Sequence, residues 1–389
     1  MRTCGRAIPR QDTRNKAQAP HLDTQTRSQG EQAGTQTETI MIQLATKTID
    51  AISQALNADK CGQFRQNLKT LFPKMDDAYR GTEDKYRRHQ GASGIGRDCA
   101  REIQLKWKWV QQSQFNERML RLFNRGHLEE ARFLAMLMCV PGVQLWYETE
   151  EGGQFKFSDY ANHYGSALDG IAMGIPDVPE GAACYTEFKT AGSKAFAKIK
   201  AKGCRAEKYE HYVQMNQCML YYKLPFSLYL VVNKDTDELY AEIIPFDQAN
   251  ADQYRNRAGE IIFTTDPLPR ISNQATFWKC KFCDEKPVCH GKKIPDINCR
   301  TCAHWSPKAE GGYSCARGHE DTVGNKHASF VGCPEHVFDP TLLPQFSYMG
   351  GNHESNYTVL RTRSGHEFKQ GPDHVTSGQL AEATCYDSL

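Results

Sequence analysis

Two short stretches decide the fold of this 389-residue chain: GSALDG at residues 165–170 and YTEFKT at residues 185–190. Both are typical of strands, and the alternation of side chains along the second strand places Glu187 and Lys189 on the same face. If the two strands are neighbours, Asp169 meets these side chains near a strand end. Two close carboxylates repel each other, so one takes up a proton unless a cation compensates. Oxygen ligands of this kind suit Mg2+ or Mn2+.

This arrangement indicates the hydrolysis of phosphodiester bonds. A bound divalent metal polarises a phosphoryl oxygen and lowers the pKa of a bound water. Lys189, two residues from a predicted metal ligand, is placed to hold the attacking water or to meet the developing negative charge. The Glu-x-Lys tripeptide alone is equally typical of an ion pair on an exposed strand, so the surrounding sequence has to decide.

The surrounding elements predict an α/β fold with a mixed central sheet and helices on its faces. The GSALDGIAM segment, residues 165–173, is expected to be one strand. Two hairpins are predicted, one joining residues 143–149 to 154–158 around Glu-Gly-Gly and one joining 226–234 to 238–246. The predicted helices are 115–140, 193–202 and 206–223, preceded by a helical segment that begins at Met41.

Composition divides the chain into five segments. Residues 1–40 carry almost no large apolar side chain, so we expect them to be disordered, and Met41 is a candidate for the natural start. Cysteine density rises and apolar periodicity vanishes after Trp278, which predicts a small domain that depends on metal. The further segments are a basic helical region (41–114), a predicted catalytic α/β core (115–279), a Cys-rich metal-binding module (280–340) and a loose C-terminal tail (341–389).

Several classes of protein are excluded. Mean hydropathy is -0.64, and the longest apolar runs, residues 133–140 and 226–232, fall far short of the ~20 residues that span a membrane. The first twenty residues contain no apolar core of a signal peptide, so we expect a reducing, cytoplasmic compartment, in which disulfides are rare. The net charge of +2 still allows a local basic surface. Residues 87–125, with nine Lys or Arg against three acids and interleaved aromatic residues, are either a phosphate-facing surface or a solvated helix face.

Further motifs lie on both sides of the two strands. The stretch NRGHLEE, residues 124–130, places His127 and Glu130 one helical turn apart, and the helix after YTEFKT carries Gln214, Gln217 and Tyr221. With these residues the chain resembles the PD-(D/E)XK nuclease superfamily, in its RecB-like exonuclease branch and especially in versions encoded by phages. The resemblance covers about residues 97–290, and it depends on the order and spacing of the motifs.

The resemblance implies a restriction-endonuclease-like fold and a role for each matching residue. Glu130, Asp169, Glu187 and the backbone carbonyl of Phe188 would bind Mg2+ or Mn2+, and Lys189 would assist the water. Gln217 and Tyr221 have the spacing of the helix that contacts DNA or orders the site, although Gln214 occupies an equally natural place. His127 is either a supporting residue or phosphate donor beside the site or an ordinary helix-surface histidine.

Two groups of cysteines are expected to bind metal. The spacing Cys280-x2-Cys283-x5-Cys289 needs a fourth ligand, for which Cys99, His290 and a later cysteine are candidates. The resemblance favours Cys99, because iron-sulfur members of the superfamily have such an upstream cysteine, and it implies a 4Fe-4S cluster with Zn2+ as the alternative. The second group, read as a structural zinc site, comprises Cys299, Cys302, Cys315 and Cys333, with His336 as the alternative fourth ligand.

Basic residues follow the catalytic strand directly. Residues 189–208 hold seven Lys or Arg against one Glu, where a DNA strand would have to pass. The predicted DNA contacts are Arg125, Lys194, Lys198, Lys200 and Lys202. The sequence therefore predicts a metal-dependent DNA nuclease. The resemblance implies an exonuclease rather than an endonuclease, acting in phage recombination, repair or replication in a bacterial host cell. It also implies a single-strand annealing or other recombination protein as a partner. The competing interpretation is a non-catalytic, zinc-containing DNA-binding protein.

Overall fold

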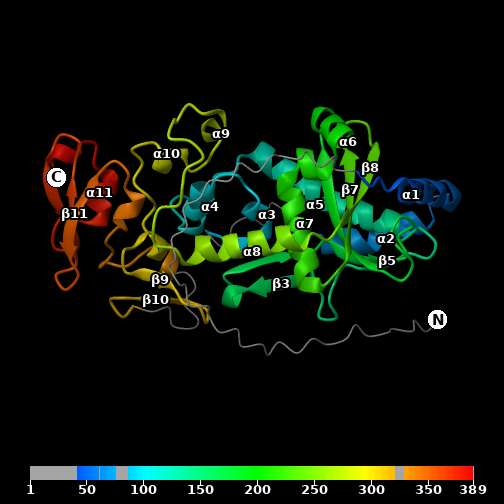
Figure 1. Ribbon diagram of the computed structural model, residues 1–389, viewed down its shortest axis with the longest axis horizontal. Helices are drawn as coiled ribbons and strands as arrows, with labels where there is room; N and C mark the ends of the chain where they lie inside the picture. Colours follow the sequence, from blue (N-terminus) through cyan, green and yellow to red (C-terminus); the bar gives the residue numbers. More distant parts are fainter. Residues whose placement is uncertain (1–41, 61, 76–85, 320–327, 389) are drawn as a thin grey trace, which may run out of the picture. The chain divides into compact units, whose positions relative to one another are not determined.

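The computed structural model describes residues 42–60, 62–75, 86–319 and 328–388, and the expected disorder of residues 1–40 falls outside them. The largest sheet of the described chain has five strands in the order β2-β5-β6-β7-β8, of which β5, β7 and β8 are labelled in the right-hand half of Figure 1. Neighbouring strands are antiparallel except β6 and β7, which are parallel over eight residue pairs. The predicted mixed central sheet is therefore present. The strands are β2 (Gln144–Trp146), β5 (Gly170–Met173), β6 (Ala183–Ala191), β7 (Phe226–Asn233) and β8 (Leu239–Pro245).

Helices cover both faces of this five-stranded sheet, because its central strands carry apolar side chains on each face. On one face, Phe188 of β6 stacks on Phe133 at 5.0 Å between ring centroids. The helices of that face are α1 (Thr46–Asp59), α2 (Gln63–Leu71) and α5 (Glu117–Leu137). The other face carries Tyr185 and Tyr229 and is covered by α6 (Ser193–Glu207), α7 (Tyr209–Tyr222) and α8 (Gln248–Phe263).

A second, three-stranded sheet in the order β1-β4-β3 corrects two predictions. The predicted hairpin over residues 143–158 does not form, because β2 pairs with β5 while β3 (Lys156–Asp159) pairs with β4 (Tyr164–Ala167). The predicted single strand 165–173 is divided at Leu168, whose backbone N–H bonds to the carbonyl of Phe155 at 2.8 Å. Asp169 therefore lies at the junction between the two sheets. The remaining strand is β1 (Gln90–Gly91), followed by α3 (Ala92–Ile95) and α4 (Ala100–Trp107).

Both tryptophans of the basic stretch are part of the core, whereas Phe115 is exposed. Trp107 and Trp109 are 2% and 4% exposed, and the guanidinium of Arg300 lies 3.7 and 3.8 Å from the centroids of their rings. Arg101 and Lys108 are also buried. These four residues therefore do not form the phosphate-facing surface that the sequence allowed. They are buried against residues such as Arg300 and Asp339 from the C-terminal part of the chain.

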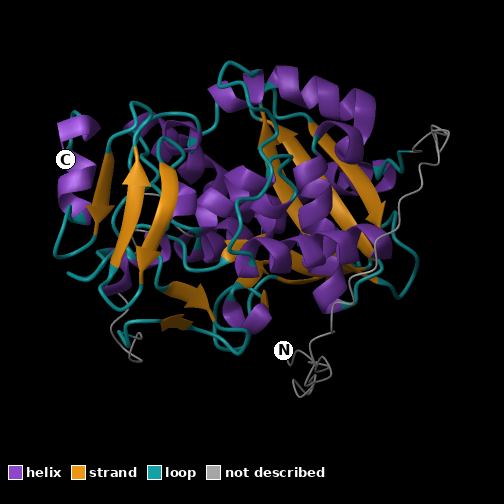
Figure 2. Ribbon diagram, turned by 60° about the vertical axis from the view of Figure 1, so that its left-hand side comes forward, coloured by secondary structure: helices purple, strands orange, loops and turns teal. Residues whose placement is uncertain are grey.

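The C-terminal region differs from the expected loose tail. After α9 (Trp278–Lys281), α10 (Lys286–Cys289) and the short pair β9 (Trp305–Pro307) and β10 (Tyr313–Cys315), the chain forms a three-stranded antiparallel sheet (Figure 2). Its strands are β11 (Ser347–Asn352), β12 (Tyr357–Arg361) and β13 (Glu367–Gln370), followed by α11 (Ser377–Glu382). Phe338, Leu360, Phe368 and Leu380 form a separate buried cluster beneath them. The alternation of buried and exposed residues in β12 and β13 explains why these strands can fold on one shared core.

Candidate active site

Four predicted site residues converge from three elements. Glu130 comes from α5, Asp169 from the junction between β4 and β5, and Glu187 and Lys189 from β6. The ammonium of Lys189 forms an ion pair with Oε1 of Glu187. The charges of Glu187, Lys189 and Glu130 all act on the carboxyl group of Asp169. We call these four residues the carboxylate–lysine site.

The carboxylate–lysine site holds more negative than positive charge. Burial and the neighbouring carboxylate of Glu187 raise the pKa of Asp169 well above its usual value, although Lys189 opposes this shift. Burial also opposes the charge of Lys189, but the carboxylates of Glu187 and Asp169 outweigh it and raise the lysine pKa. Three carboxyl groups therefore surround one ammonium, and a bound cation would relieve the repulsion that remains.

The backbone of Phe188 fixes one of the carboxylates. Its N–H donates to Oδ2 of Asp169 at 2.9 Å, which holds the junction between the two sheets against β6. Since the N–H and C=O groups of one strand residue point to the same neighbour, the Phe188 carbonyl faces the same side. The predicted use of this carbonyl as a metal ligand stays a prediction.

Two residues that the sequence did not single out support the site. The hydroxyl of Tyr185 donates a hydrogen bond to Oε2 of Glu187, which is completely buried. Nδ1 of His211 lies 2.9 Å from the hydroxyl of Tyr229, and burial, followed by the charge of Lys189, lowers the pKa of His211 to about 3. Strand alternation could have identified Tyr185, two residues before Glu187. No local signal identifies His211, because α7 brings it to the site.

Gln217 has a different position from the one expected of a DNA contact. It is completely buried, accepts a hydrogen bond from the Tyr164 hydroxyl at 3.0 Å, and donates to the Ala251 carbonyl at 2.8 Å. This burial favours the second of its two expected roles, ordering the site, over direct contact with DNA. Its contacts link α7 to β4 and α8, so it orders the strand that leads to Asp169.

Tyr221 and Gln214 also lie on α7. The Tyr221 ring stacks on Phe157 at 4.1 Å between centroids, and its hydroxyl donates to Oδ2 of Asp159 at 2.5 Å. Arg255 donates to the same oxygen at 2.7 Å. These contacts place Tyr221 at the packing of α7 against β3. Gln214 is buried, with an exposed fraction of 9%. His127 lies one turn before Glu130 on α5.

The predicted DNA-contacting lysines lie on the exposed face of α6, directly after β6. Lys200 pairs with Glu238 at 2.6 Å, while Lys198 and Lys202 lie 3.7 and 3.9 Å from the carboxylate of Glu207. All three side chains are more than half exposed, which leaves them accessible to phosphate groups. Lys194 is exposed on the first turn of α6, and Arg125 donates from α5 to the backbone carbonyl of Lys234 at 2.6 Å.

The first cysteine group is defined by Cys99, Cys280, Cys283 and Cys289. All four line a cavity of about 20 Å³, together with Glu102 and His290. Burial, followed by the Cys99 thiol, raises the pKa of Cys280, and burial raises that of Cys283 to about 12. The structure therefore brings Cys99 beside residues about 180 positions further along the chain.

The second cysteine group is defined by Cys299, Cys302, Cys315 and Cys333. Burial raises the pKa of Cys299 to about 12, and the thiols of the other three members add to this shift. The alternative ligand His336 is already engaged, since its Nδ1 lies 2.8 Å from the Ser377 hydroxyl and its Nε2 lies 3.1 Å from the Asn298 carbonyl. This engagement favours Cys333 as the fourth member.

Within the described ranges, no three or more His, Cys, Asp or Glu side chains are arranged so that they could hold a metal ion. Magnesium or manganese at the carboxylate–lysine site, and metal at either cysteine group, therefore stay predictions. The donor chemistry fits in each case: carboxylate oxygens suit Mg2+ and Mn2+, and four thiolates suit an iron-sulfur cluster or zinc.

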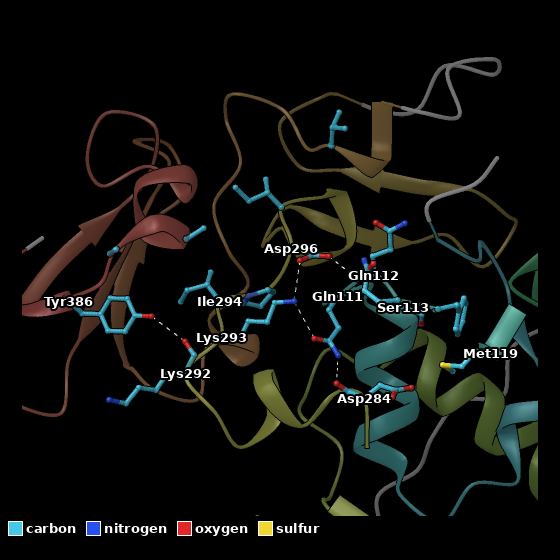
Figure 3. A pocket seen from close by; sticks show the side chains of 17 residues that line it. Gln111, Gln112, Ser113, Met119, Asp284, Lys292, Lys293, Ile294, Asp296 and Tyr386 are labelled. Atoms are coloured by element: carbon cyan, nitrogen blue, oxygen red, sulfur yellow. Dashed lines mark hydrogen bonds and ion pairs between the residues drawn. The ribbon is translucent and has the colours of Figure 1, made fainter. Parts of the chain in front are cut away.

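A larger cavity lies away from these residues. It has a volume of about 1050 Å³ and is lined by residues from the segment after α4, the cysteine-rich loops and the C-terminal helix (Figure 3). Lys293 bridges Oε1 of Gln111 and Oδ1 of Asp296, at 3.2 and 3.5 Å. No member of the carboxylate–lysine site lines this cavity, so its size does not indicate the site of the chemistry.

Comparisons with known proteins give no family assignment. No family model matches the chain, and no curated protein matches it. Among solved structures, the chain is similar to SSO0001 (13% identity, TM-score 0.33), with 58% of this chain and 94% of that one covered. It is also similar to the alkaline exonuclease LHK-Exo from Laribacter hongkongensis (15% identity, TM-score 0.31), with 44% and 85% covered, and to the same exonuclease in complex with dAMP (15%, 0.33) over the same shares. In the described part of the chain, no helix is long and apolar enough to cross a membrane.

Proposed function

We propose that this protein is a Mg2+- or Mn2+-dependent deoxyribonuclease of the exonuclease type. The observation that carries this proposal is the meeting of Glu130, Asp169, Glu187 and Lys189 in one site, in which Glu187 is completely buried and the other three residues are half-buried. Three carboxyl groups and one ammonium, supplied by a helix, a sheet junction and a strand, provide the groups that phosphodiester hydrolysis needs.

The residues would act from fixed positions. When bound, the divalent metal supplies Lewis-acid activation of a phosphoryl oxygen and of the water. The N–H of Phe188 orients Asp169, and the hydroxyl of Tyr185 orients Glu187, so the oxygen ligands need little rearrangement. Lys189, ion-paired to Glu187, stays protonated and can hold the attacking water or the charged transition state.

The DNA substrate is inferred from the basic helix beside the site. Lys194, Lys198, Lys200 and Lys202 project from α6, which begins two residues after the end of β6. Lysines in such a position neutralise phosphates without reading sequence. The preference for exonuclease over endonuclease activity rests on the resemblance to RecB-like nucleases alone.

We also propose a metal centre at each cysteine group. The first group would hold a 4Fe-4S cluster, with zinc as the alternative, and the second group would hold zinc. Thiols must lose their protons to bind metal, whereas burial favours the neutral thiol when no metal is bound. Metal analysis of anaerobically purified protein tests both assignments directly.

The test of the function uses purified protein with Mg2+ or Mn2+ on linear DNA labelled at either end, and on a closed circle. An exonuclease shortens the linear DNA from an end and leaves the circle intact. Asp169→Asn, purified identically, should cut neither, which excludes a contaminating nuclease. Binding of DNA without cleavage of either substrate would instead support a non-catalytic DNA-binding protein.

A further inference from the structure

Trp278 on α9 and Phe282 directly after it expose their rings to solvent beside the first cysteine group. Figure 1 labels α9. The exposed fraction is 60% for Trp278 and 84% for Phe282. Cys280, between them in the sequence, is buried and lines the small thiol cavity. The chain has five tryptophans, and the four other than Trp278 are buried or half-buried, as Trp107 and Trp305 illustrate. The fold therefore does not use the rings of Trp278 and Phe282 for its own packing.

The helical turn places these rings on one face. Trp278 and Phe282 are four residues apart, a spacing that puts Cβ atoms about 5–6 Å from each other on a helix. The turn is fixed by a hydrogen bond from the Lys281 N–H to the Phe277 carbonyl at 3.0 Å. Trp278 contacts the ring of Phe277 at 6.1 Å, and in the described chain no ring contact joins it to Phe282. The Phe282 ring, and the part of the Trp278 ring that Phe277 and Lys279 leave uncovered, are therefore accessible to a planar ligand.

Charged side chains of both signs, Lys279 and Lys281 with Asp98 and Asp284, surround the rings. Lys279 lies with its Nζ 5.1 Å from the centroid of Trp278 and forms an ion pair with Asp98, while Lys281 is exposed between the rings. A protein partner that docks on aromatic anchors is expected to meet an apolar surround. Here the exposed neighbours of the rings include Lys281 and Asp284 instead. Aromatic rings interleaved with lysines match a polyanion with flat, unpaired rings.

We infer that Trp278 and Phe282 form a stacking platform for unpaired bases of a nucleic acid strand, with Lys279 and Lys281 contacting its phosphates. The inference rests on the proposed function, and it narrows the substrate to DNA with a single-stranded segment. Stacking is tolerant of sequence because every base offers a flat face, so the platform would bind the strand without selecting it by base identity.

The test measures binding of the metal-loaded protein, purified without oxygen, to two oligonucleotides of equal charge. One is an oligothymidine of about 12 nucleotides, and the other has the same backbone with abasic sites. No Mg2+ or Mn2+ is added, so binding is separated from cleavage. Trp278→Ala and Phe282→Ala should each weaken binding of the oligothymidine about tenfold and leave binding of the abasic strand unchanged. Trp278→Phe should restore most of the loss.

Tyr348→Ala is the matched control, because Tyr348 is 58% exposed on β11. The inference is overturned if Trp278→Ala and Phe282→Ala bind the oligothymidine as tightly as the parent, or if they lose equal affinity for both strands. The first result would leave the aromatic pair for a protein partner. Cleavage is then measured separately with Mg2+: a parent that cuts DNA without base-dependent binding refutes the platform alone, and a parent that shows base-dependent binding without cutting refutes the nuclease function alone.

Discussion

The carboxylate–lysine site and the two cysteine groups are held in place by different interactions. Glu187 and Lys189 belong to a strand paired on both sides, with eight residue pairs to β7 on one edge. Cys280, Cys289 and Cys299 lie in helical turns of three or four residues, Cys315 lies in the short pair β9–β10, and Cys99 caps the N-terminus of α4. Removing metal should therefore have different consequences: the first region should keep its fold and lose chemistry, and the second should lose its fold.

The two regions also differ in what metal must overcome. At Asp169, neighbouring carboxylates repel each other when no cation is bound, and uptake of one proton relieves this repulsion. At the cysteines, burial raises the thiol pKa, so several protons must leave before metal binds. Metal binding at the cysteine groups should therefore be coupled to folding, whereas metal binding at Asp169 should be coupled mainly to activity.

The largest expected effect is on the chemistry. Lys189→Ala and Glu187→Gln should each reduce DNA cleavage by about a thousandfold or more, because both groups act on the reacting water or on the metal. The five-stranded sheet should still form, since its ladder does not depend on these side chains. Initial rates and circular dichroism of the purified variants check both parts.

Lys69→Ala serves as the charge-matched control for this prediction, because Lys69 is exposed on α2. A Lys189→Ala variant that cuts at more than about a tenth of the parental rate would contradict the assignment of the site. In that case, the ion pair between Lys189 and Glu187 would only be structural.

The next effect concerns Cys99. If it shares a cluster with Cys280, Cys283 and Cys289, protein purified without oxygen should be brown and contain iron, together with zinc at the second cysteine group. Cys99→Ser should lose the colour and the iron and melt at a temperature lower by at least about 5 °C, since metal binding contributes folding free energy. Elemental analysis and thermal unfolding provide the measurements.

Cys385→Ser is the control for this change, because Cys385 is exposed near the C-terminus. Two equivalents of zinc, no iron, and an unchanged melting temperature for Cys99→Ser would show that Cys99 is only a packing residue. The nuclease assignment would not be affected, because it rests on the carboxylate–lysine site.

The same contrast explains what the sequence could predict. Glu187 and Lys189 were placed correctly on one face because strand alternation is a local property. The break at Leu168 was missed because it depends on the Phe155 carbonyl of another strand. The burial of Gln217 was missed because α7 packs between β4 and α8, which no pattern in its own sequence indicates.

Other errors have the same origin in distant contacts. The surface expected around Trp107 became core because its partner Arg300 lies 193 residues away. The C-terminal strands were missed because β11 contains consecutive glycines and is mostly exposed, so its alternation is weak. Spacing proposed Cys280, Cys283 and Cys289 of the first cysteine group and all members of the second. The choice of Cys99 as the fourth member of the first group followed from the family resemblance.

A smaller effect is expected at Arg300, which joins the second cysteine group to the N-terminal helices. Its guanidinium donates to the backbone carbonyls of Trp107 and Arg88 and lies against the Trp109 ring. Arg300→Ala should destabilise the protein by about 3 kcal/mol, because it leaves two buried carbonyls unpaired and opens a cavity. Urea unfolding measures the change.

Arg300→Lys should retain only part of this stability, since lysine lacks the planar fork that reaches both carbonyls. The exposed Arg363→Ala is the control and should change stability by less than about 0.5 kcal/mol. Equal stability of the parent and Arg300→Ala would show that the second cysteine group does not depend on this contact.

The smallest expected effect is on DNA affinity through α6. Replacing Lys198, Lys200 and Lys202 by glutamine should weaken binding at low salt and leave the cleavage rate at saturating DNA unchanged, because these lysines lie outside the carboxylate–lysine site. Each lost phosphate contact lowers the slope of log affinity against log salt by about 0.9 on duplex DNA. Glu207 and Glu238 already partly neutralise the three lysines, so we expect a total decrease of about one to two rather than the full sum. Glu238→Gln should instead strengthen DNA binding at low salt and steepen its salt dependence, since it frees Lys200 to contact phosphate. An unchanged slope in the triple variant would place the DNA on a different face.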